Sequence, residues 1–277
     1  GCPLSCVWCH NPESKSALME IAFDGGRCID CGACRERCPE HALSKDNPFY
    51  IDREKCTLCF ECVAACPSGA LEQVGKKMSA DEILEKVLPD KPFFDASGGG
   101  VTLSGGEPTL FMDFTAGLLA ALRRENIHTL IETCGLFDMD RFMALLYPLL
   151  DIIYFDIKII DPAAHKTHCG VANDRILANF KTLFQRARTE GKPVLPRTPL
   201  IPGITDTEEN IAGIAAFLKN LNVKQAALLA YNPLWHDKTG KIGAADPYKT
   251  HKAMTTFADK SVLEKSRKIF ANAGIET

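Results

Sequence analysis

Hydrophobic and polar positions in residues 78–277 predict strands and helices in alternation. Five short apolar runs predict strands at 101–104, 128–133, 151–158, 193–198 and 225–233. Apolar residues with helical spacing predict helices at 113–125, 138–147, 174–190, 205–221 and 250–273. Ser79 opens a capping-box sequence that predicts one more helix before the first strand. Strands that alternate with helices in this way predict a parallel α/β sheet or barrel.

The first 77 residues follow a different pattern, in which cysteine dominates. The chain has 277 residues and 13 cysteines, and all cysteines except Cys134 and Cys169 lie before residue 67. An odd number excludes complete disulfide pairing, and a chain of this length can bury a core without crosslinks. We therefore interpret the cysteine groups as metal ligands.

Two of these groups repeat the spacing C-x2-C-x2-C-x3-C-P. This spacing is typical of bacterial ferredoxins with two clusters, in which the fourth cysteine of each run binds the other cluster. One predicted [4Fe–4S] cluster is therefore held by Cys28, Cys31, Cys34 and Cys66. The other is held by Cys56, Cys59, Cys62 and Cys38. Two zinc sites are the alternative, although zinc ligands usually come as separated C-x2-C pairs.

A third group, Cys2, Cys6 and Cys9, has the spacing C-x3-C-x2-C. Three thiolates leave one iron of a [4Fe–4S] cluster without a protein ligand, and an open metal position is typical of catalytic sites. That iron could bind the amine and carboxylate of an amino acid. The alternatives are a chance triplet and a cluster completed by His10.

Polar residues stand at or near the ends of all five predicted strands. They are Gly105, Gly106, Glu107, Glu132, Thr133, Asp156, Lys158, Arg197, Tyr231 and Asn232. In parallel α/β folds the active site lies at the carboxyl ends of the strands. The sequence therefore predicts that these side chains converge on one face.

Composition and charge exclude several classes of protein. The formal net charge is −3, with 24% charged and 46% hydrophobic residues, so we expect an ordinary soluble composition and no nucleic-acid partner. No apolar run reaches the ~18 residues of a membrane span, so we expect no membrane partner. The sequence begins with Gly1 rather than Met, which suggests a trimmed N-terminus or a fragment.

The motifs together resemble the radical S-adenosylmethionine (SAM) superfamily. Within it they resemble the activating enzymes of glycyl radical enzymes, such as pyruvate formate-lyase activating enzyme. The resemblance covers nearly the whole chain. It is carried by the loop Cys2–His10, the glycine-rich Gly98–Pro108, Glu132–Gly135, Asp156–Lys158, Arg197–Gly203 and Tyr231–Asn232. Asn232 stands where the family commonly has His, and the family's first strand and Gly-Pro-Gly-x-Arg segment are absent from this sequence.

The resemblance implies a partial (β/α)6 TIM-type barrel with an inserted ferredoxin-like α+β domain. We expect the cluster loop at 1–20, the ferredoxin-like insert at 21–77 and the rest of the barrel at 78–277. The implied cofactors are SAM and three [4Fe–4S] clusters, with a monovalent cation near Glu132 and Asp156.

Specific residue roles follow from the same resemblance. It implies catalytic roles for Cys2, Cys6, Cys9 and Lys158. It implies contacts with SAM or its cluster at Trp8, His10, Gly105, Gly106, Glu107, Glu132, Thr133, Asp156, Ile157, Lys158, Arg197 and Asn232. Lys158 would pair with the SAM carboxylate, Asp156 would order it, and the Gly105–Glu107 backbone would receive the SAM amine.

The implied activity is reductive cleavage of SAM to a 5′-deoxyadenosyl radical, which takes hydrogen from a backbone glycine of a partner glycyl radical enzyme. A flavodoxin or ferredoxin would supply electrons, and we expect a monomer in an anaerobic cytoplasm. The alternatives are a radical SAM enzyme with auxiliary clusters acting on another substrate, and a ferredoxin-type electron carrier.

Simpler interpretations exist for the individual residues. Lys158 could be a strand-end lysine, Glu107 a helix cap and Trp8 a packing aromatic. Residues 98–106 could cradle a phosphate, but they lack the Lys-Ser/Thr of a P-loop. Cys134 and Cys169 are far in sequence from other cysteines, so we expect small buried thiols. We expect His165 and His168 to form hydrogen bonds.

Overall fold

The computed structural model describes all residues 1–277 and divides into two compact units. The smaller unit contains Gly1, residues 9–77 and residues 233–255. The larger unit contains residues 2–8, 78–232 and 256–277. None of the helices combines the length and apolar composition needed to cross a lipid bilayer.

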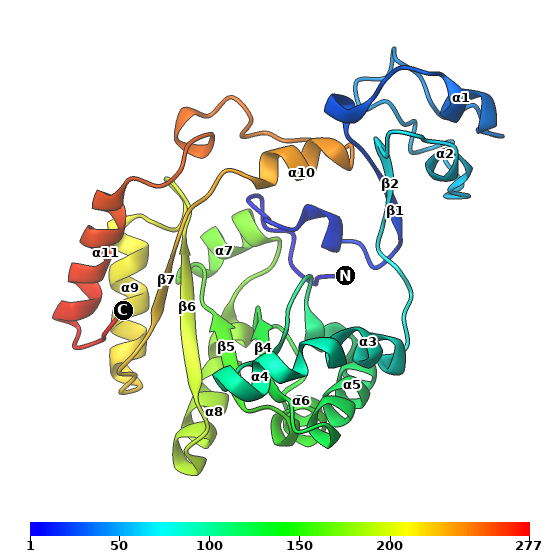
Figure 1. Cartoon of the computed structure of the whole chain (residues 1–277). Coiled ribbons are helices and arrows are strands. Elements are labelled where there is room, and N and C mark those ends of the chain that lie inside the picture. The colour runs from blue at the N-terminus through cyan, green and yellow to red at the C-terminus, as the bar shows by residue number, and fades with distance from the viewer. The chain divides into compact units, whose positions relative to one another are not determined.

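The larger unit is built on one parallel sheet of five strands in the order β3-β4-β5-β6-β7 (Figure 1). The strands are β3 (Gly100–Leu103), β4 (His128–Thr133), β5 (Ile152–Asp156), β6 (Val194–Leu200) and β7 (Ala227–Ala230). All five strands predicted from the apolar runs are confirmed. Their spatial order follows their order in sequence, so each crossover places a strand beside its predecessor.

Alternate positions of the central strands form the core beneath the helices. Ile131 on β4 and Ile153 and Phe155 on β5 have no exposed surface. The intervening residues, such as Glu132 and Asp156, keep a small part of their surface exposed. Because side chains alternate across a strand, the apolar positions anchor the sheet while the polar ones stay available on its other face.

Eight helices belong to the larger unit. They are α3 (Ala80–Val87), α4 (Lys91–Ser97), α5 (Met112–Arg124), α6 (Met139–Leu145), α7 (Pro162–Cys169), α8 (Asp174–Glu190), α9 (Glu208–Asn220) and α11 (Lys260–Asn272). Figure 1 shows α9 and α11 packed together beside β7. The predicted helices at 113–125, 138–147, 174–190 and 205–221 are confirmed to within a few residues, whereas α4 and α7 were not predicted.

Capping explains where two of these helices begin. The Ser79 hydroxyl accepts from the Glu82 amide at 3.1 Å, and the Glu82 carboxylate accepts from the Ser79 amide at 2.7 Å, which confirms the predicted capping box. The predicted helix at 250–273 is wrong in its first ten residues. Asp259 accepts from the Ser261 amide at 2.8 Å and caps α11, so the helix begins only at Lys260.

The smaller unit carries the two repeated cysteine runs. Strands β1 (Glu20–Phe23) and β2 (Leu71–Val74) pair antiparallel and join the two ends of this segment. Its helices are α1 (Ala33–Arg37), α2 (Glu61–Ala64) and α10 (Trp235–Lys241). Its apolar core is Ile21, Ala42, Leu43, Ile51 and Leu71, packed with the buried Cys34, Cys38 and Cys62.

Short 3₁₀ turns complete the two units. They lie at Pro12–Ser14, Gly25–Arg27, Leu88–Asp90, Pro108–Phe111, Tyr147–Leu149 and Lys252–Met254.

Candidate active site

The parallel sheet brings polar side chains from three strands together at its carboxyl edge. Asp156 at the end of β5 pairs in register with Arg197 on β6, and Glu132 lies near the end of β4. Lys158 follows β5 by two residues. Because all strands run in the same direction, residues far apart in sequence meet here, as the sequence predicted for these three strands.

These side chains form a continuous network of ion pairs. The Lys158 ammonium lies 2.7 Å from the Asp156 carboxylate, and the Arg197 guanidinium lies 2.8 Å from the other Asp156 oxygen. Arg197 also binds Glu132, which accepts from the Ser104 hydroxyl at 2.7 Å. The guanidinium thus joins two carboxylates, and Asp156 joins the two cations.

The side chains of Asp156, Lys158 and Arg197 are largely removed from solvent, and their mutual contacts outweigh the effect of burial on their pKa values. Burial alone would raise the pKa of Asp156, but the adjacent Lys158 and Arg197 cations outweigh it and hold that pKa below its ordinary value. Burial would likewise lower the pKa of Lys158, yet the Asp156 carboxylate raises it. Asp156 and Lys158 therefore both stay charged at neutral pH.

Glu107 links the turns after β3 and β4. Its side chain is 4% exposed. One carboxylate oxygen accepts from the amide of Thr109 at 3.1 Å and from the hydroxyls of Thr109 and Thr133 at 2.7 and 2.8 Å. The other accepts from the Cys134 amide at 2.6 Å. The interpretation of Glu107 as a cap is therefore confirmed, and the same carboxylate also fixes the next turn.

The glycines before Glu107 leave this turn open. Gly105 has φ of +112°, a conformation that L side chains rarely adopt, and nothing lies within 4 Å of where its Cβ would be. Gly105 is exposed and Gly106 is half-buried. Backbone groups of this turn are therefore accessible to a ligand.

Residues 2–8 of the cysteine loop belong to the same unit as the sheet. Cys6 and Trp8 are buried, and Cys2 is half-buried. The Ser5 amide donates to the Cys169 carbonyl at 2.9 Å, and the Val7 amide donates to the His168 carbonyl at 3.0 Å. Cys9 and His10 belong to the smaller unit.

Cys134 and Cys169 are buried thiols, as predicted, but each lies beside a loop cysteine. Cys134 is hydrogen-bonded to Cys2, and this bond is the main cause that lowers the pKa of the Cys2 thiol to about 7. A hydrogen bond to Cys6 is the main cause that raises the pKa of Cys169, and burial adds to it. The sequence gave no sign of these contacts, because Cys134 and Cys169 are far along the chain from Cys2 and Cys6.

Other predicted residues have more varied surroundings. The Ile157 side chain is buried in the core, and its amide donates to the Arg197 carbonyl at 2.8 Å. The Thr133 hydroxyl is used by Glu107. Asn232 is half-buried two residues after β7. His165 is buried, and its Nδ1 lies 2.6 Å from the Val171 carbonyl, which confirms its expected hydrogen bond.

Three buried asparagines support the site and were not predicted. Asn210 on α9 binds the Ile160 amide at 2.8 Å and the carbonyls of Lys158 and Thr205. Asn173 binds the carbonyls of Ile159 and Ile160, and Asn179 binds those of Gly135 and Phe137. The sequence does contain a sign of such a residue, which is a side-chain amide on an otherwise apolar helix face. Asn179, on the same face of α8 as Ile176 and Phe180, is an example.

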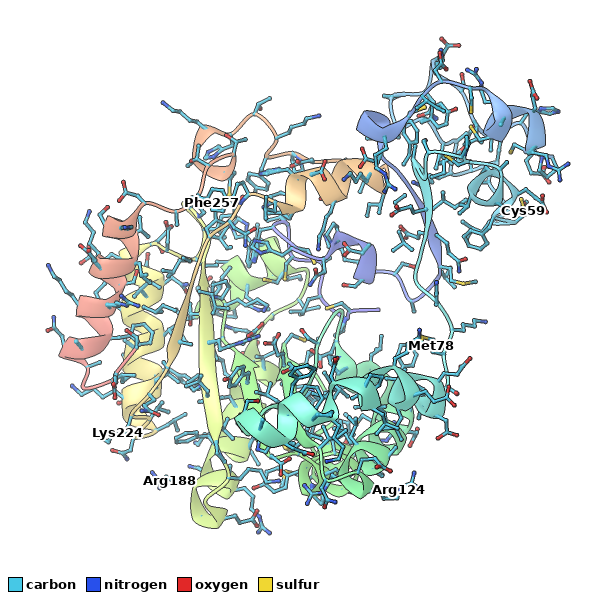
Figure 2. The ribbon with its side chains drawn as sticks, in the orientation of Figure 1. Cys59, Met78, Arg124, Arg188, Lys224 and Phe257 are labelled. Atoms are coloured by element: carbon cyan, nitrogen blue, oxygen red, sulfur yellow. The ribbon has the colours of Figure 1, made fainter.

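The smaller unit contains two cavities, each lined by four cysteines. One is lined by Cys28, Cys31, Cys34 and Cys66, among other residues. The other is lined by Cys38, Cys56, Cys59 and Cys62, among other residues. These are the two sets that the ferredoxin spacing predicted, with the fourth cysteine of each run exchanged. Figure 2 shows sulfur atoms gathered in this unit, with the exposed Cys59 at its edge.

No three His, Cys, Asp or Glu side chains converge on a position for a single metal ion. The ligands of a cubane cluster bind four separate irons, so they surround a volume instead of meeting at one point. A cavity lined by four thiols fits that requirement.

Comparison with known proteins identifies the class of enzyme. The family model of the radical SAM superfamily matches residues 1–215. A radical SAM methyltransferase from Sphaerobacter thermophilus is similar in fold, with a TM-score of 0.53 and 15% identity, over 80% of this chain and 60% of that one. The curled parallel sheet is therefore the α/β partial barrel of this superfamily, as predicted.

Closer relatives define the family. Isethionate sulfite-lyase activating enzyme of Nitratidesulfovibrio vulgaris is 45% identical over 86% of this chain and 78% of its own length. The (2S)-3-sulfopropanediol sulfolyase activating enzyme of Bilophila wadsworthia is 42% identical over 88% of this chain and 81% of its own. The chain therefore belongs to the radical SAM activating enzymes of glycyl radical enzymes. It is an oxidoreductase that cleaves SAM and activates a partner enzyme.

Proposed function

We propose that this chain activates a glycyl radical enzyme that releases sulfite from a small organosulfonate. The support is the identity of 45% and 42% to activating enzymes of an isethionate sulfite-lyase and a sulfopropanediol sulfolyase. An activating enzyme for choline trimethylamine-lyase is less similar, at 34% identity.

The test is glycyl radical formation, measured by electron paramagnetic resonance (EPR), in purified candidate partners. We expect the radical signal to form in an isethionate or sulfopropanediol lyase and to be weak or absent in a choline lyase mixed under the same conditions. Equal radical yield in all partners would contradict the sulfonate assignment. A radical in the choline lyase alone would contradict it more directly.

For catalysis, Cys2, Cys6 and Cys9 would hold the cluster that supplies the electron for cleavage of the SAM sulfonium. Lys158, fixed by Asp156, would bind the SAM carboxylate, and the open Gly105–Glu107 backbone would receive the amine. Arg197 and Asn232 would line the nucleoside side, and Trp8 and His10 the cluster side. The charged network at the carboxyl edge of the sheet is the single observation that carries this assignment.

The monovalent cation near Glu132 and Asp156 remains a prediction. In the structure the Arg197 guanidinium already joins these two carboxylates. The second oxygen of Asp156 binds Lys158 and that of Glu132 binds Ser104, so a cation would have to share these oxygens with existing partners. A dependence of SAM affinity on the choice of Na⁺ or K⁺ would support the cation, and an equal affinity in both salts would argue against it.

We further propose that residues 21–77 are a ferredoxin-like insert between the cluster loop 1–20 and the barrel 78–277. Its two cysteine-lined cavities would hold two more [4Fe–4S] clusters, which would relay electrons from a flavodoxin or ferredoxin. Clusters open to oxygen would require an anaerobic cytoplasm, and we propose a monomeric activating enzyme.

Replacing Cys59 with Ala tests the relay. We expect slower SAM cleavage with a flavodoxin donor and an unchanged rate with dithionite, which can reduce the SAM cluster directly. An unchanged rate with both donors would contradict the relay and favour a docking role for the insert.

A further inference from the structure

The carboxyl end of α7 is in backbone contact with the cysteine loop. The amides of Ser5 and Val7 donate to the carbonyls of Cys169 and His168 at 2.9 and 3.0 Å. Cys6 lies between these two bonds and is 8% exposed. The loop forms no helix or strand through Asn11, so these bonds to another element restrain it at the cysteine itself.

A glycine at the end of the helix lies against the same loop. Gly170 is the residue after α7, with φ of +90°, and its amide donates to the Lys166 carbonyl at 3.0 Å. A Cβ on Gly170 would lie 2.3 Å from the Ser5 hydroxyl oxygen. Any other residue would therefore force Ser5 to move its hydroxyl or the loop to shift.

The helix behind this contact is well fixed. Asp161 caps its start by accepting from the Ala164 amide at 2.7 Å. His165, which is buried, lies 2.6 Å from the Val171 carbonyl and holds the segment after Gly170. The end of α7 is thus a rigid surface against which a loop can be positioned.

We propose that residues 168–170 form a clamp that sets the position of Cys6, and that Gly170 is a positioning residue for cluster binding and SAM cleavage. The proposal rests on the proposed role of Cys2, Cys6 and Cys9 as ligands of the SAM cluster. Ligands of an open cluster must be held to within ~0.5 Å, which a loop without internal structure cannot achieve alone. The Cys169 side chain, with no exposed surface and in contact with Cys6, extends the clamp from the backbone to the thiol.

The test compares Gly170→Ala with a matched variant, Gly191→Ala. Gly191 also follows a helix of this unit in a left-handed conformation, with φ of +71°, but nothing lies within 4 Å of its Cβ position. Both variants carry the same kind of backbone strain, and only Gly170→Ala meets Ser5. A double variant, Gly170→Ala with Ser5→Ala, removes the hydroxyl that the new Cβ meets.

The measurements are iron content and EPR spectra of the reduced protein with and without SAM. We expect wild type and Gly191→Ala to show a signal that shifts when SAM is added. Gly170→Ala should lose most of that signal and about four irons per chain while keeping the spectrum of the other clusters. The double variant should regain the SAM-dependent signal.

Three results would overturn the clamp. Gly170→Ala could behave as Gly191→Ala does, or it could lose all clusters together. The Ser5→Ala change could also fail to restore the signal. A wild-type protein with a cluster but no response to SAM would instead overturn the proposed function, and the clamp with it.

Discussion

Asp156 is the carboxylate that neutralises both cations of the site. It binds both Lys158 and Arg197, and these cations hold its pKa below the ordinary value despite its burial. A variant without this carboxylate leaves two buried cations with fewer partners. The residue is therefore expected to support both the stability of the sheet edge and the binding of an anionic group by Lys158.

Replacing Asp156 with Asn should lower the free energy of unfolding at pH 7 by roughly 3–5 kcal/mol, the usual cost of breaking a buried ion pair. The control is Asp113→Asn, because Asp113 also pairs with an arginine at 2.8 Å but its side chain is 83% exposed. That change should cost less than about 1 kcal/mol. Denaturant unfolding of iron-free protein measures both, and equal losses would contradict the prediction.

The same pair of variants gives a pH dependence with a definite sign. The pKa of Asp156 is lowered in the folded state, so its carboxylate contributes stability above its ordinary pKa of 3.8 and loses it as the pH falls further. The difference between wild type and Asp156→Asn should therefore be constant from pH 7 to about 5 and shrink in stronger acid. A difference that grows in acid would contradict the assigned direction.

Asn210 supports the backbone next to the charged side chains of the site. Its side chain makes hydrogen bonds to Ile160, Lys158 and Thr205, so it fixes the backbone that carries the Lys158 ammonium. Asn210→Ala should cost about 1–3 kcal/mol of unfolding free energy, because several buried polar groups lose their partner. It should also weaken SAM binding, measured by calorimetry. The exposed Asn220→Ala on the same helix should change neither.

At this scale the sequence predicted the charged residues but not their supports. Asp156, Lys158 and Arg197 stand in recognisable positions at strand ends, and parallel topology alone brings them together. Asn210 and Cys169 lie on helices, where their contacts depend on how α9 and α7 pack against the sheet. Spacing along the chain carries no information about that packing.

At the scale of elements, the site depends on turns more than on the strands themselves. The turns after β3 and β4 are joined through one buried carboxylate, Glu107, which accepts four hydrogen bonds. This carboxylate holds the turn that contains Gly105 and Gly106 against the end of β4 and the turn that follows it. The helix predictions at 113–125 and 174–190 succeeded because amphipathic periodicity is a local property. The helix predicted at 250–273 is wrong over 250–259, because the side chain that caps this helix is Asp259, at the end of that region.

Glu107→Gln tests the link between the two turns. A glutamine presents an NH₂ group to donors that need an acceptor, so at least one hydrogen bond is lost and two donors face each other. We expect a loss of about 1–3 kcal/mol in unfolding free energy and a higher dissociation constant for SAM. Glu85→Gln on the exposed side of α3 is the control and should leave both quantities unchanged. Normal SAM affinity in Glu107→Gln would show that the link is not needed for binding.

At the scale of the whole molecule, the chain combines a sheet-based unit with a unit organised around cysteines. The smaller unit has two short strands and a small apolar core, part of which is cysteine. A core of this size gains stability when its thiols are bound by metal, because the folded form is the one that binds. Removal of iron should therefore destabilise the smaller unit more than the sheet, which has its own large core.

The exchange of the fourth cysteines between the two runs is the most specific expectation for this unit. If it is correct, Cys66 serves the same cluster as Cys31, although Cys66 is closer in sequence to Cys59. The EPR spectrum of reduced Cys66→Ala should then match that of Cys31→Ala, and the spectrum of Cys38→Ala should match that of Cys59→Ala. If each run held its own cluster, Cys66→Ala would instead match Cys59→Ala. The cavities favour the exchanged arrangement, because each is lined by three cysteines of one run and the last cysteine of the other.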